Sequence, residues 1–338
     1  MYNNLTVKSS IKNYTISFNQ NLDNIKKIIN ELDTLTILDS NIKKLYPELS
    51  TKNNIIIECN ENAKTLDGAN NVLQTFIEKK INIKTKLVVI GGGILQDLIG
   101  FCASIYCRGI DYILIPTTLL AQTDSCVGGK TSINFFNKKN ILGTFYPPKE
   151  IIICPLFLKT LSKIDFLSGL GEIYKFHILQ NKIDNFNLDN EITKMIYKGL
   201  QYKIDILSRD EFDKGERKFL NYGHTFGHAL ESTSNYNLPH GLAIVIGCLI
   251  STKVAIKLNY TVSNSVTIFK KGIKLIQDSG IPIQKEWFNT EALLTAAKSD
   301  KKSTGELTMV LVDNKPFLEN IKDVTIIDDI LKEVYESI

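Results

Sequence analysis

The chain has 338 residues, of which 43% are hydrophobic and 22% are charged, and its formal net charge is +4. This length allows one large or two ordinary globular domains, and the charge is too small to indicate a nucleic-acid-binding protein. The first residues, MYNNLTVKSS, lack the apolar segment of a signal peptide, and the longest apolar runs, such as 242–250, are shorter than a bilayer span. We therefore expect a cytoplasmic protein that binds neither nucleic acid nor membrane.

The first 160 residues alternate short apolar runs with helical patterns. Strands are predicted at 35–38, 54–58, 86–90, 112–115 and 151–154, and helices at 21–32, 66–79 and 94–106. Such alternation predicts a parallel sheet covered by helices on both faces. From Leu161 the pattern is mostly helical, with a small β segment expected near 307–312. We predict a Rossmann-like α/β domain over 1–160 and a mostly helical domain over 161–338.

Three glycines, Gly91 to Gly93, follow a predicted strand and open a predicted helix, and Asp97 lies one turn into that helix. Glycines let the backbone approach a phosphate, and a helix N-terminus offers free N–H groups. However, Gln96 stands where the third glycine of G-x-G-x-x-G would fall. A tight turn without a ligand is therefore an equally good interpretation.

A second glycine-containing loop, 124–140, reads DSCVGGKTSINFFNKKN. Its segment Gly128-Gly129-Lys130 resembles part of a P-loop, but the first glycine of that motif is missing. ATP hydrolysis is excluded on this ground, and anion binding is retained.

Three of the four histidines lie in one stretch near residues 217–240. His224 and His228 are four residues apart, so they would share a helix face, and His240 follows after a short loop. Neutral imidazole is a common zinc ligand, and a catalytic zinc site uses three protein ligands. The H-x-x-x-H pair alone fits two core histidines equally well, but His240 favours a metal site. Thr225 after His224 excludes the H-E-x-x-H motif of zinc proteases.

Taken together, these motifs resemble the 3-dehydroquinate synthase family. The resemblance runs through 91–148, from GGGILQDL to GTFYPP, and continues with GLGEIYKFHIL from Gly169. It includes the segment from Asp210 that contains GERKFLNYGHTFGHALE, then HG at His240 and SDKK from Ser299. Nearly the whole chain is covered. The resemblance implies a dehydroquinate synthase-like fold, with an NAD-binding α/β domain and a helical domain that binds metal and substrate.

The resemblance also implies a phosphorus–oxygen lyase of the shikimate pathway. Its small-molecule substrate would be 3-deoxy-arabino-heptulosonate 7-phosphate, converted to 3-dehydroquinate and phosphate by oxidation, phosphate elimination, reduction and aldol cyclisation. NAD and Zn²⁺ (or Co²⁺) would be the cofactors, and the protein would be a homodimer. The alternatives are a sister cyclase acting on sedoheptulose 7-phosphate, an NAD- and metal-dependent polyol dehydrogenase, and a binding protein on an inherited fold.

Three sets of site residues follow from the resemblance. The metal ligands would be Glu172, His224 and His240. The NAD contacts would be Asp39, Glu61, Lys64, Gly91, Gly92, Gly93, Asp97, Thr117, Thr118 and Lys139. The substrate pocket would contain Asp124, Lys130, Asn140, Lys175, Lys203, Arg217, Asn221, His228 and one of Lys301 or Lys302. Arg108 would reach the pocket of a neighbouring subunit.

Two further expectations concern residues close to the ligands. The family usually has glutamate after the HG of the last ligand, where this chain has Leu242. We expect this loss of a carboxylate to weaken the support of the metal ligands. Arg217 precedes Asn221 by one helical turn and His224 by two, so we expect all three on one wall of the site. There Arg217 would pair with the substrate's carboxylate.

Overall fold

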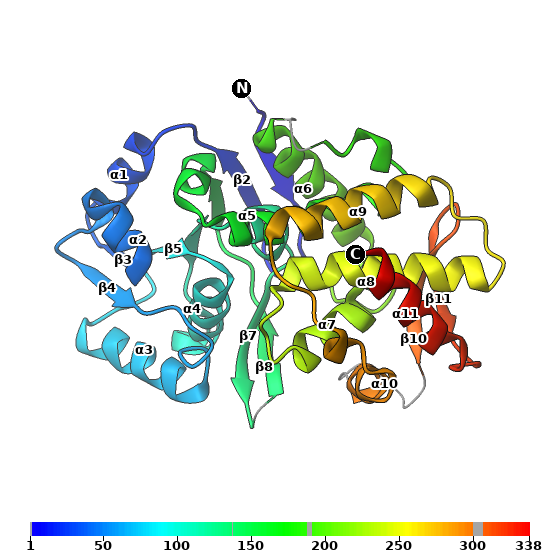
Figure 1. Cartoon of the computed structure of the whole chain (residues 1–338). Helices are drawn as coiled ribbons and strands as arrows, with labels where there is room; N and C mark the ends of the chain where they lie inside the picture. The colour runs from blue at the N-terminus through cyan, green and yellow to red at the C-terminus, as the bar shows by residue number, and fades with distance from the viewer. Residues whose placement is uncertain (1, 137, 188–190, 300–306) are drawn as a thin grey trace. The chain divides into compact units, whose positions relative to one another are not determined.

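The computed structural model describes residues 2–136, 138–187, 191–299 and 307–338 (Figure 1). It divides into two compact units, Met1–Leu161 with Ile196–Phe212, and Ser162–Met195 with Asp213–Ile338. The first division lies beside the domain boundary expected at residue 160. The return of Ile196–Phe212 to the first unit was not part of that expectation. This segment contains most of helix α6 (Ile192–Arg209).

The first unit is built on a seven-stranded sheet with the order β1-β2-β9-β6-β5-β3-β4. All neighbouring strands are parallel except β1 and β2. The strands are β1 (Leu5–Val7), β2 (Tyr14–Phe18), β3 (Thr34–Asp39), β4 (Asn54–Ile57), β5 (Lys86–Gly91), β6 (Tyr112–Pro116) and β9 (Glu150–Ile153). The central strands are nearly continuous apolar runs because helices bury both of their faces. The predicted α/β fold class is thus present in this unit.

Four helices accompany the sheet: α1 (Asp23–Ile29), α2 (Ser40–Leu45), α3 (Leu66–Glu78) and α4 (Gly93–Ile105). One hydrophobic core joins Ile25 and Ile29 of α1 and Ile42 of α2 to strand residues such as Val88 and Ile115. Helix α4 packs on β5 and β6. The predicted helices at 21–32, 66–79 and 94–106 correspond to α1, α3 and α4.

The segment 124–140 is not simply the loop that its glycines suggested. A short π-helical turn (Ala121–Ser125) leads into an antiparallel hairpin of β7 (Lys130–Phe135) and β8 (Lys138–Phe145). Side chains alternate along β7, so Thr131 and Ile133 are buried. Thr131 packs at Gly100 of α4, where an added Cβ would lie 2.7 Å from the threonine methyl group. The glycine and lysine content hid this two-residue alternation.

The second unit is mostly helical, as predicted. Its elements are α5 (Lys163–Leu179), α7 (His224–Thr233), α8 (His240–Lys257), α9 (Ser265–Ser279), α10 (Thr290–Ser299), α11 (Ile326–Ser337) and the hairpin β10 (Thr308–Val312)–β11 (Pro316–Asn320). The hairpin includes the β segment expected near 307–312. Among its described residues the unit also has three 3₁₀ turns, η5 (Ile183–Asn185), η6 (Glu216–Asn221) and η7 (Lys285–Phe288).

Helix α8 is the core helix of this unit, and α5, α7, α9 and α11 pack against it. Its eighteen residues are long and apolar enough to cross a bilayer, although the apolar run read from the sequence, 242–250, was shorter. Inside the chain 78% of this window is buried, which is the behaviour of a core helix. The apolar composition of α8 is therefore explained by packing.

Glycines let three helices of this unit approach closely. A Cβ added to Gly171 of α5 would lie 2.1 Å from the carbonyl oxygen of Gly241 in α8, and one added to Gly241 would lie 1.7 Å from the carbonyl oxygen of Ser168. Similarly, a Cβ on Gly247 of α8 would lie 1.9 Å from the carbonyl oxygen of Gly223, which precedes α7. Side chains at these positions would push the helices apart.

Gly223 combines a left-handed backbone conformation with a close helix contact, so a substitution there has two costs. Its φ is +78°, and an added Cβ would lie 2.6 Å from Cys248 Sγ and 2.8 Å from Cys248 N. Gly280 is a matched control, because its φ is +70° and an added Cβ meets nothing within 4 Å. We expect Gly280→Ala to cost about 1–2 kcal/mol from backbone conformation alone. Gly223→Ala should cost about 1–3 kcal/mol more, since it also overpacks the helix contact. Urea unfolding of the two variants measures the difference; equal losses would contradict this packing account.

Candidate metal centre and nucleotide-binding edge

Three predicted ligands from three helices converge in the second unit. Glu172 lies in the middle of α5, His224 is the first residue of α7, and His240 is the first residue of α8. Glu172 Oε1 is 3.6 Å from His224 Nε2 and 3.4 Å from His240 Nε2. Glu172 is fully buried, whereas the His240 side chain keeps 29% of its surface exposed. The close glycine contacts described above set these distances, because each ligand is next to one of the glycines.

The buried carboxylate of Glu172 has the character of a cation ligand. Its Oε1 makes no hydrogen bond with the described residues, while its Oε2 forms an ion pair with Lys175 one turn later. Burial raises the pKa of Glu172, but Lys175 and His240 outweigh burial and lower that pKa to about 2. A buried charged oxygen without a proton donor is costly. A divalent cation held jointly with the two imidazoles fits this oxygen.

The two imidazoles are oriented by their other ring nitrogens. His224 Nδ1 lies 3.2 Å from the carbonyl oxygen of Tyr222, and His240 Nδ1 lies 3.0 Å from Glu231 Oε2. Both contacts place a proton on Nδ1 and leave Nε2 facing Glu172. Burial, followed by the charge of Lys175, holds the pKa of His224 well below its usual value. Burial also lowers the pKa of His240, but the neighbouring carboxylates of Glu172 and Glu231 raise it to about 10.

Glu231 is the residue of this cluster that sequence reasoning missed. It follows His224 by seven residues and His228 by three, so all three share one face of α7. That spacing was the available signal. A carboxylate contact to His240 comes from Glu231 of α7, and the effect expected of Leu242 stays a prediction. Leu242 itself is fully buried in α8.

The remaining substrate residues predicted for this unit lie nearby in sequence, but not on one helix. Arg217 and Asn221 belong to the 3₁₀ helix η6, and Gly223, in a left-handed conformation, interrupts the chain before His224. The predicted continuous register of Arg217, Asn221 and His224 is therefore wrong. Arg217 is buried and Asn221 half-buried. The exposed ring of His228 lies with its centroid 5.1 Å from that of His224.

Lys175 is buried against Glu172, as its position one turn later suggested. Lys301 and Lys302 lie outside the described residues.

In the first unit, four of the residues predicted to bind NAD lie at or directly after the carboxyl ends of parallel strands. Asp39 ends β3, Gly91 ends β5, and Thr117 and Thr118 follow β6. The strand register pairs Leu38 with Ile90 and Gly91 with Pro116, so these ends form one edge of the sheet. Ligands of open α/β sheets bind at this edge.

The glycine turn leaves the start of α4 uncovered. Gly92 is the N-cap of α4 and, having no side chain, provides no capping hydrogen bond, and Gly93 begins the helix. A helix N-terminus of this kind favours an anionic group. Asp39 instead caps α2, since its Oδ1 accepts a hydrogen bond from Asn41 N at 2.8 Å.

A polar network joins predicted NAD residues to a predicted substrate residue. The buried Lys64 ammonium donates to Asp97 Oδ2 and to Asn140 Oδ1. Ser132 Oγ lies 3.0 Å from the same Asp97 oxygen and 2.9 Å from the same Asn140 oxygen. Burial raises the pKa of Asp97, an effect that Lys64 and Ser132 partly oppose. Ser132 was not predicted; its alternation with Lys130 on β7 was the available signal.

Glu61 and Lys139 complete the NAD set that the resemblance implied. Lys139 Nζ lies 3.7 Å from Glu61 Oε1, which links the β7–β8 hairpin to the segment before α3. Asn134 of the same hairpin also donates to Glu61 Oε2 at 2.8 Å.

Among the substrate residues predicted in the first unit, Lys203 and Asp124 contact each other, whereas Lys130 and Arg108 are exposed. Lys203 of α6 donates to the carbonyl oxygen of Asp124 at 2.5 Å and lies 2.9 Å from Asp124 Oδ1. Lys130 is exposed at the start of β7, directly after Gly128 and Gly129, both of which have positive φ. The return of α6 to the first unit therefore brings Lys203 to Asp124. Arg108 is exposed and has a φ of +64°.

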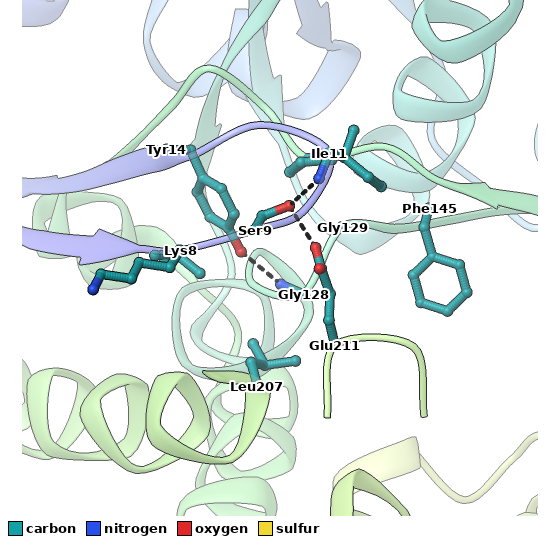
Figure 2. A pocket seen from close by; sticks show the side chains of 11 residues that line it. Lys8, Ser9, Ile11, Tyr14, Gly128, Gly129, Phe145, Leu207 and Glu211 are labelled. Atoms are coloured by element: carbon teal, nitrogen blue, oxygen red, sulfur yellow. Dashed lines mark hydrogen bonds between the residues drawn. The ribbon is translucent and has the colours of Figure 1, made fainter. Parts of the chain in front are cut away.

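An N-terminal turn supports the Gly128–Gly129 loop (Figure 2). Gly128 N–H donates to Tyr14 Oη at 3.0 Å, and Ser9 Oγ donates to Glu211 Oε1, just after α6. These residues border a cavity of about 10 Å³. Such a volume holds at most about one water molecule, so this region joins structural elements and is no ligand site.

A dinucleotide-type strand edge in one unit and a cluster of two histidines and one carboxylate in the other are typical of enzymes that combine a nucleotide cofactor with a metal. Comparison with known proteins gives the family. The family model described as "3-dehydroquinate synthase N-terminal" matches residues 54–168. The model described as "3-dehydroquinate synthase C-terminal" matches residues 169–303. The chain belongs to the 3-dehydroquinate synthase family, whose members are phosphorus–oxygen lyases. The predicted family and enzyme class are confirmed.

Curated relatives agree with this result over most of the chain. The 3-dehydroquinate synthase of Alkaliphilus metalliredigens is 35% identical over 308 residues, which cover 85% of each chain. That of Pyrococcus furiosus is 37% identical and covers 80% of each chain. That of Campylobacter concisus is 32% identical and covers 98% of this chain and 99% of its own.

Solved structures show that the fold is that of sugar phosphate cyclases, as predicted. A 2-deoxy-scyllo-inosose synthase complexed with carbaglucose-6-phosphate, NAD⁺ and Co²⁺ has a TM-score of 0.84 at 23% identity, over 98% of this chain and 99% of that one. The 2-epi-5-epi-valiolone synthase of Streptomyces hygroscopicus, with NAD⁺ and Zn²⁺ bound, has a TM-score of 0.80 at 22% identity, over 96% and 97%. Glycerol dehydrogenase from Schizosaccharomyces pombe is less similar, with a TM-score of 0.59 at 14% identity, over 95% and 89%.

The support of the glycine loop can be tested at Tyr14. Tyr14→Phe removes the oxygen that accepts from buried Gly128 N–H, which should cost about 1–3 kcal/mol of stability. We expect faster hydrogen exchange in a peptide spanning residues 126–132. Tyr46→Phe is the control, because it removes a phenol that donates to the carbonyl oxygen of Leu156 at 3.3 Å. Unchanged exchange at 126–132 in Tyr14→Phe would show that the turn does not support this loop.

Proposed function

We propose that this chain converts 3-deoxy-arabino-heptulosonate 7-phosphate to 3-dehydroquinate and phosphate with the residues described above. One observation carries the assignment: a chain of the 3-dehydroquinate synthase family brings Glu172, His224 and His240 together around a buried oxygen that has no described hydrogen bond. Zn²⁺ or Co²⁺ would bind there through two imidazole nitrogens and one carboxylate oxygen. When bound, the metal makes a coordinated hydroxyl easier to deprotonate.

Lys175 keeps two of the three ligands in the protonation states that metal binding needs. Lys175 holds the Glu172 carboxylate ionised inside the unit and disfavours a proton on His224. A metal ligand must be an anionic carboxylate or a neutral imidazole, so both effects favour the cation. This gives the buried Lys175 a function that an exposed lysine would lack.

The strand edge of the first unit would hold NAD, which when bound accepts a hydride from the substrate and returns it, so that no net redox change occurs. The uncapped start of α4 at Gly92 and Gly93 suits the pyrophosphate. Asp39, at the end of β3, would be the acidic residue that accepts from a ribose hydroxyl, as in dinucleotide-binding folds. Thr117 and Thr118 follow β6, and the Lys64–Asp97–Asn140 network fixes the side chains that border this edge.

The substrate carries a phosphate and a carboxylate, and cationic side chains would bind both. Lys130 follows a loop with two positive-φ glycines, and Lys203 is held by Asp124. Fixed cations of this kind neutralise a departing phosphate without reorganising solvent. Arg217 would pair with the carboxylate through its two-pronged guanidinium. The exposed Arg108 would complete the site of a second subunit, so we propose a homodimer.

The comparisons favour a sugar acid over a neutral sugar phosphate. Curated relatives named 3-dehydroquinate synthase are 32–37% identical to this chain, whereas the solved cyclases with other names are 21–23% identical. The polyol dehydrogenases are more distant still, at 14%.

The function is tested by incubating the purified protein with NAD, Zn²⁺ and either sugar. We expect phosphate release and 3-dehydroquinate from the heptulosonate phosphate, no turnover of sedoheptulose 7-phosphate, and no net gain in NADH absorbance. Equal turnover of the two sugars would favour the sister cyclase, and accumulating NADH would favour a dehydrogenase.

Selectivity for the sugar acid should depend on Arg217. Arg217→Lys keeps the charge but loses the fork, so we expect KM to rise and kcat to fall together, since a misplaced substrate also loses alignment. Arg209→Lys is the matched control: this residue pairs with Asp205 on the surface of α6 at 2.8 Å, and its replacement should leave both constants unchanged. If Arg217→Lys kept the wild-type KM and kcat, the substrate's carboxylate would have to pair with another cationic side chain.

A further inference from the structure

Glu231 touches the candidate metal centre without being one of its three ligands. Its Oε2 lies 3.0 Å from His240 Nδ1, on the side of the ring opposite to the nitrogen that faces Glu172. Its side chain is 16% exposed, so water competes little for this contact. An imidazole that donates from Nδ1 to a carboxylate keeps its Nε2 lone pair fixed in direction and more basic.

Glu231 also anchors the chain that leads to His240. Its carbonyl oxygen accepts from Ser234 Oγ at 3.0 Å and from Tyr236 N at 2.7 Å, and Ser234 Oγ in turn accepts from Leu238 N at 3.3 Å. One residue of α7 therefore holds both the connection between α7 and α8 and the first side chain of α8. The other histidine ligand has a different support, because His224 Nδ1 faces a backbone carbonyl. Only the support of His240 can be removed by a side-chain substitution.

A different use of the same residues must be weighed. His228, Glu231 and His240 form a second group whose ligand atoms lie within 4.8 Å of one another. A second cation there would use His240 Nδ1, the nitrogen that donates to Glu231. His240 would then bridge two metals as an imidazolate and would have to lose both ring protons, which a single metal at Nε2 does not require. The geometry favours one cation, with Glu231 as the acceptor behind its ligand.

We propose that Glu231 is the positioning residue that directs His240 Nε2 at the metal. This inference rests on the metal centre of the proposed function and extends it to a residue outside the ligand set. Removal of such a partner typically weakens metal affinity 10–100-fold. Glu231→Gln keeps an oxygen that can accept from Nδ1 but loses the charge. Its zinc affinity should therefore fall by the smaller factor, about 10-fold. Glu231→Ala loses both the accepting oxygen and the charge, so its zinc affinity should fall by nearly 100-fold.

The experiment measures zinc affinity of the purified full chain by competition with a chelator of known affinity. The metal content of the wild type, the absorption spectrum of the Co²⁺-loaded protein and the melting temperature of the metal-free protein are recorded alongside. Thr233→Val is the matched control: it removes a hydrogen bond from the same helix to the carbonyl oxygen of Trp287 (2.9 Å) but touches no ligand. A merely structural residue lowers the melting temperature and leaves affinity and spectrum unchanged, which is the result expected for Thr233→Val.

We expect one zinc per wild-type chain, the graded loss of affinity in Glu231→Gln and Glu231→Ala, and a shifted Co²⁺ spectrum in both. Wild-type affinity and spectrum in Glu231→Ala, or in Glu231→Gln if the alanine variant does not fold, would overturn the inference. Two zinc ions per wild-type chain, falling to one in the Glu231 variants, would overturn it in favour of the second cation site. A wild type that binds no zinc would instead reject the metal centre itself.

Discussion

The contact of α5 and α7 with α8 through bare backbone is the constraint on which the rest of the second unit depends. Each metal-ligand candidate is the sequence neighbour of a glycine at such a contact: Glu172 follows Gly171, His224 follows Gly223, and His240 precedes Gly241. Backbone-to-backbone packing leaves no room for adjustment by side-chain rotation. The distances between the three ligands are therefore set by helix packing, and the glycines are as much part of the site as the histidines.

This packing also explains how a carboxylate is kept charged in the core. An isolated buried charge is costly, but Lys175 lies one helical turn from Glu172 and pairs with one of its oxygens. The other oxygen remains directed at two imidazoles whose outer nitrogens are engaged by Tyr222 and Glu231. The first unit would bind its ligand in a different way. The helix α4 starts without a side-chain cap at the edge of the sheet, and its free N–H groups suit a diphosphate.

The sequence predicted best the helices and strands whose hydrophobic pattern lies within one continuous segment. The apolar strands β3, β5 and β6 and the helices α3 and α4 fall within about two residues of their expected bounds. The metal ligands came from family motifs, since spacing alone did not separate a metal site from core histidines. The return of α6 and the contact of Ser132 with Asp97 depend on residues far apart in sequence. The β7–β8 hairpin is local, but its glycines and lysines hid the alternation, and the contact of Glu231 with His240 depends on how the chain turns between α7 and α8. The break at Gly223 was missed because an isolated glycine is also tolerated inside a helix.

The central claim is that one cation is held by Glu172, His224 and His240, and X-ray absorption at the zinc edge of the zinc-loaded protein tests it most directly. The account predicts a first shell of nitrogen and oxygen only, with the scattering of two imidazole rings, and loss of one ring's contribution in either His224→Ala or His240→Ala. A sulfur ligand from one of the six cysteines, or an unchanged spectrum in both variants, would contradict it.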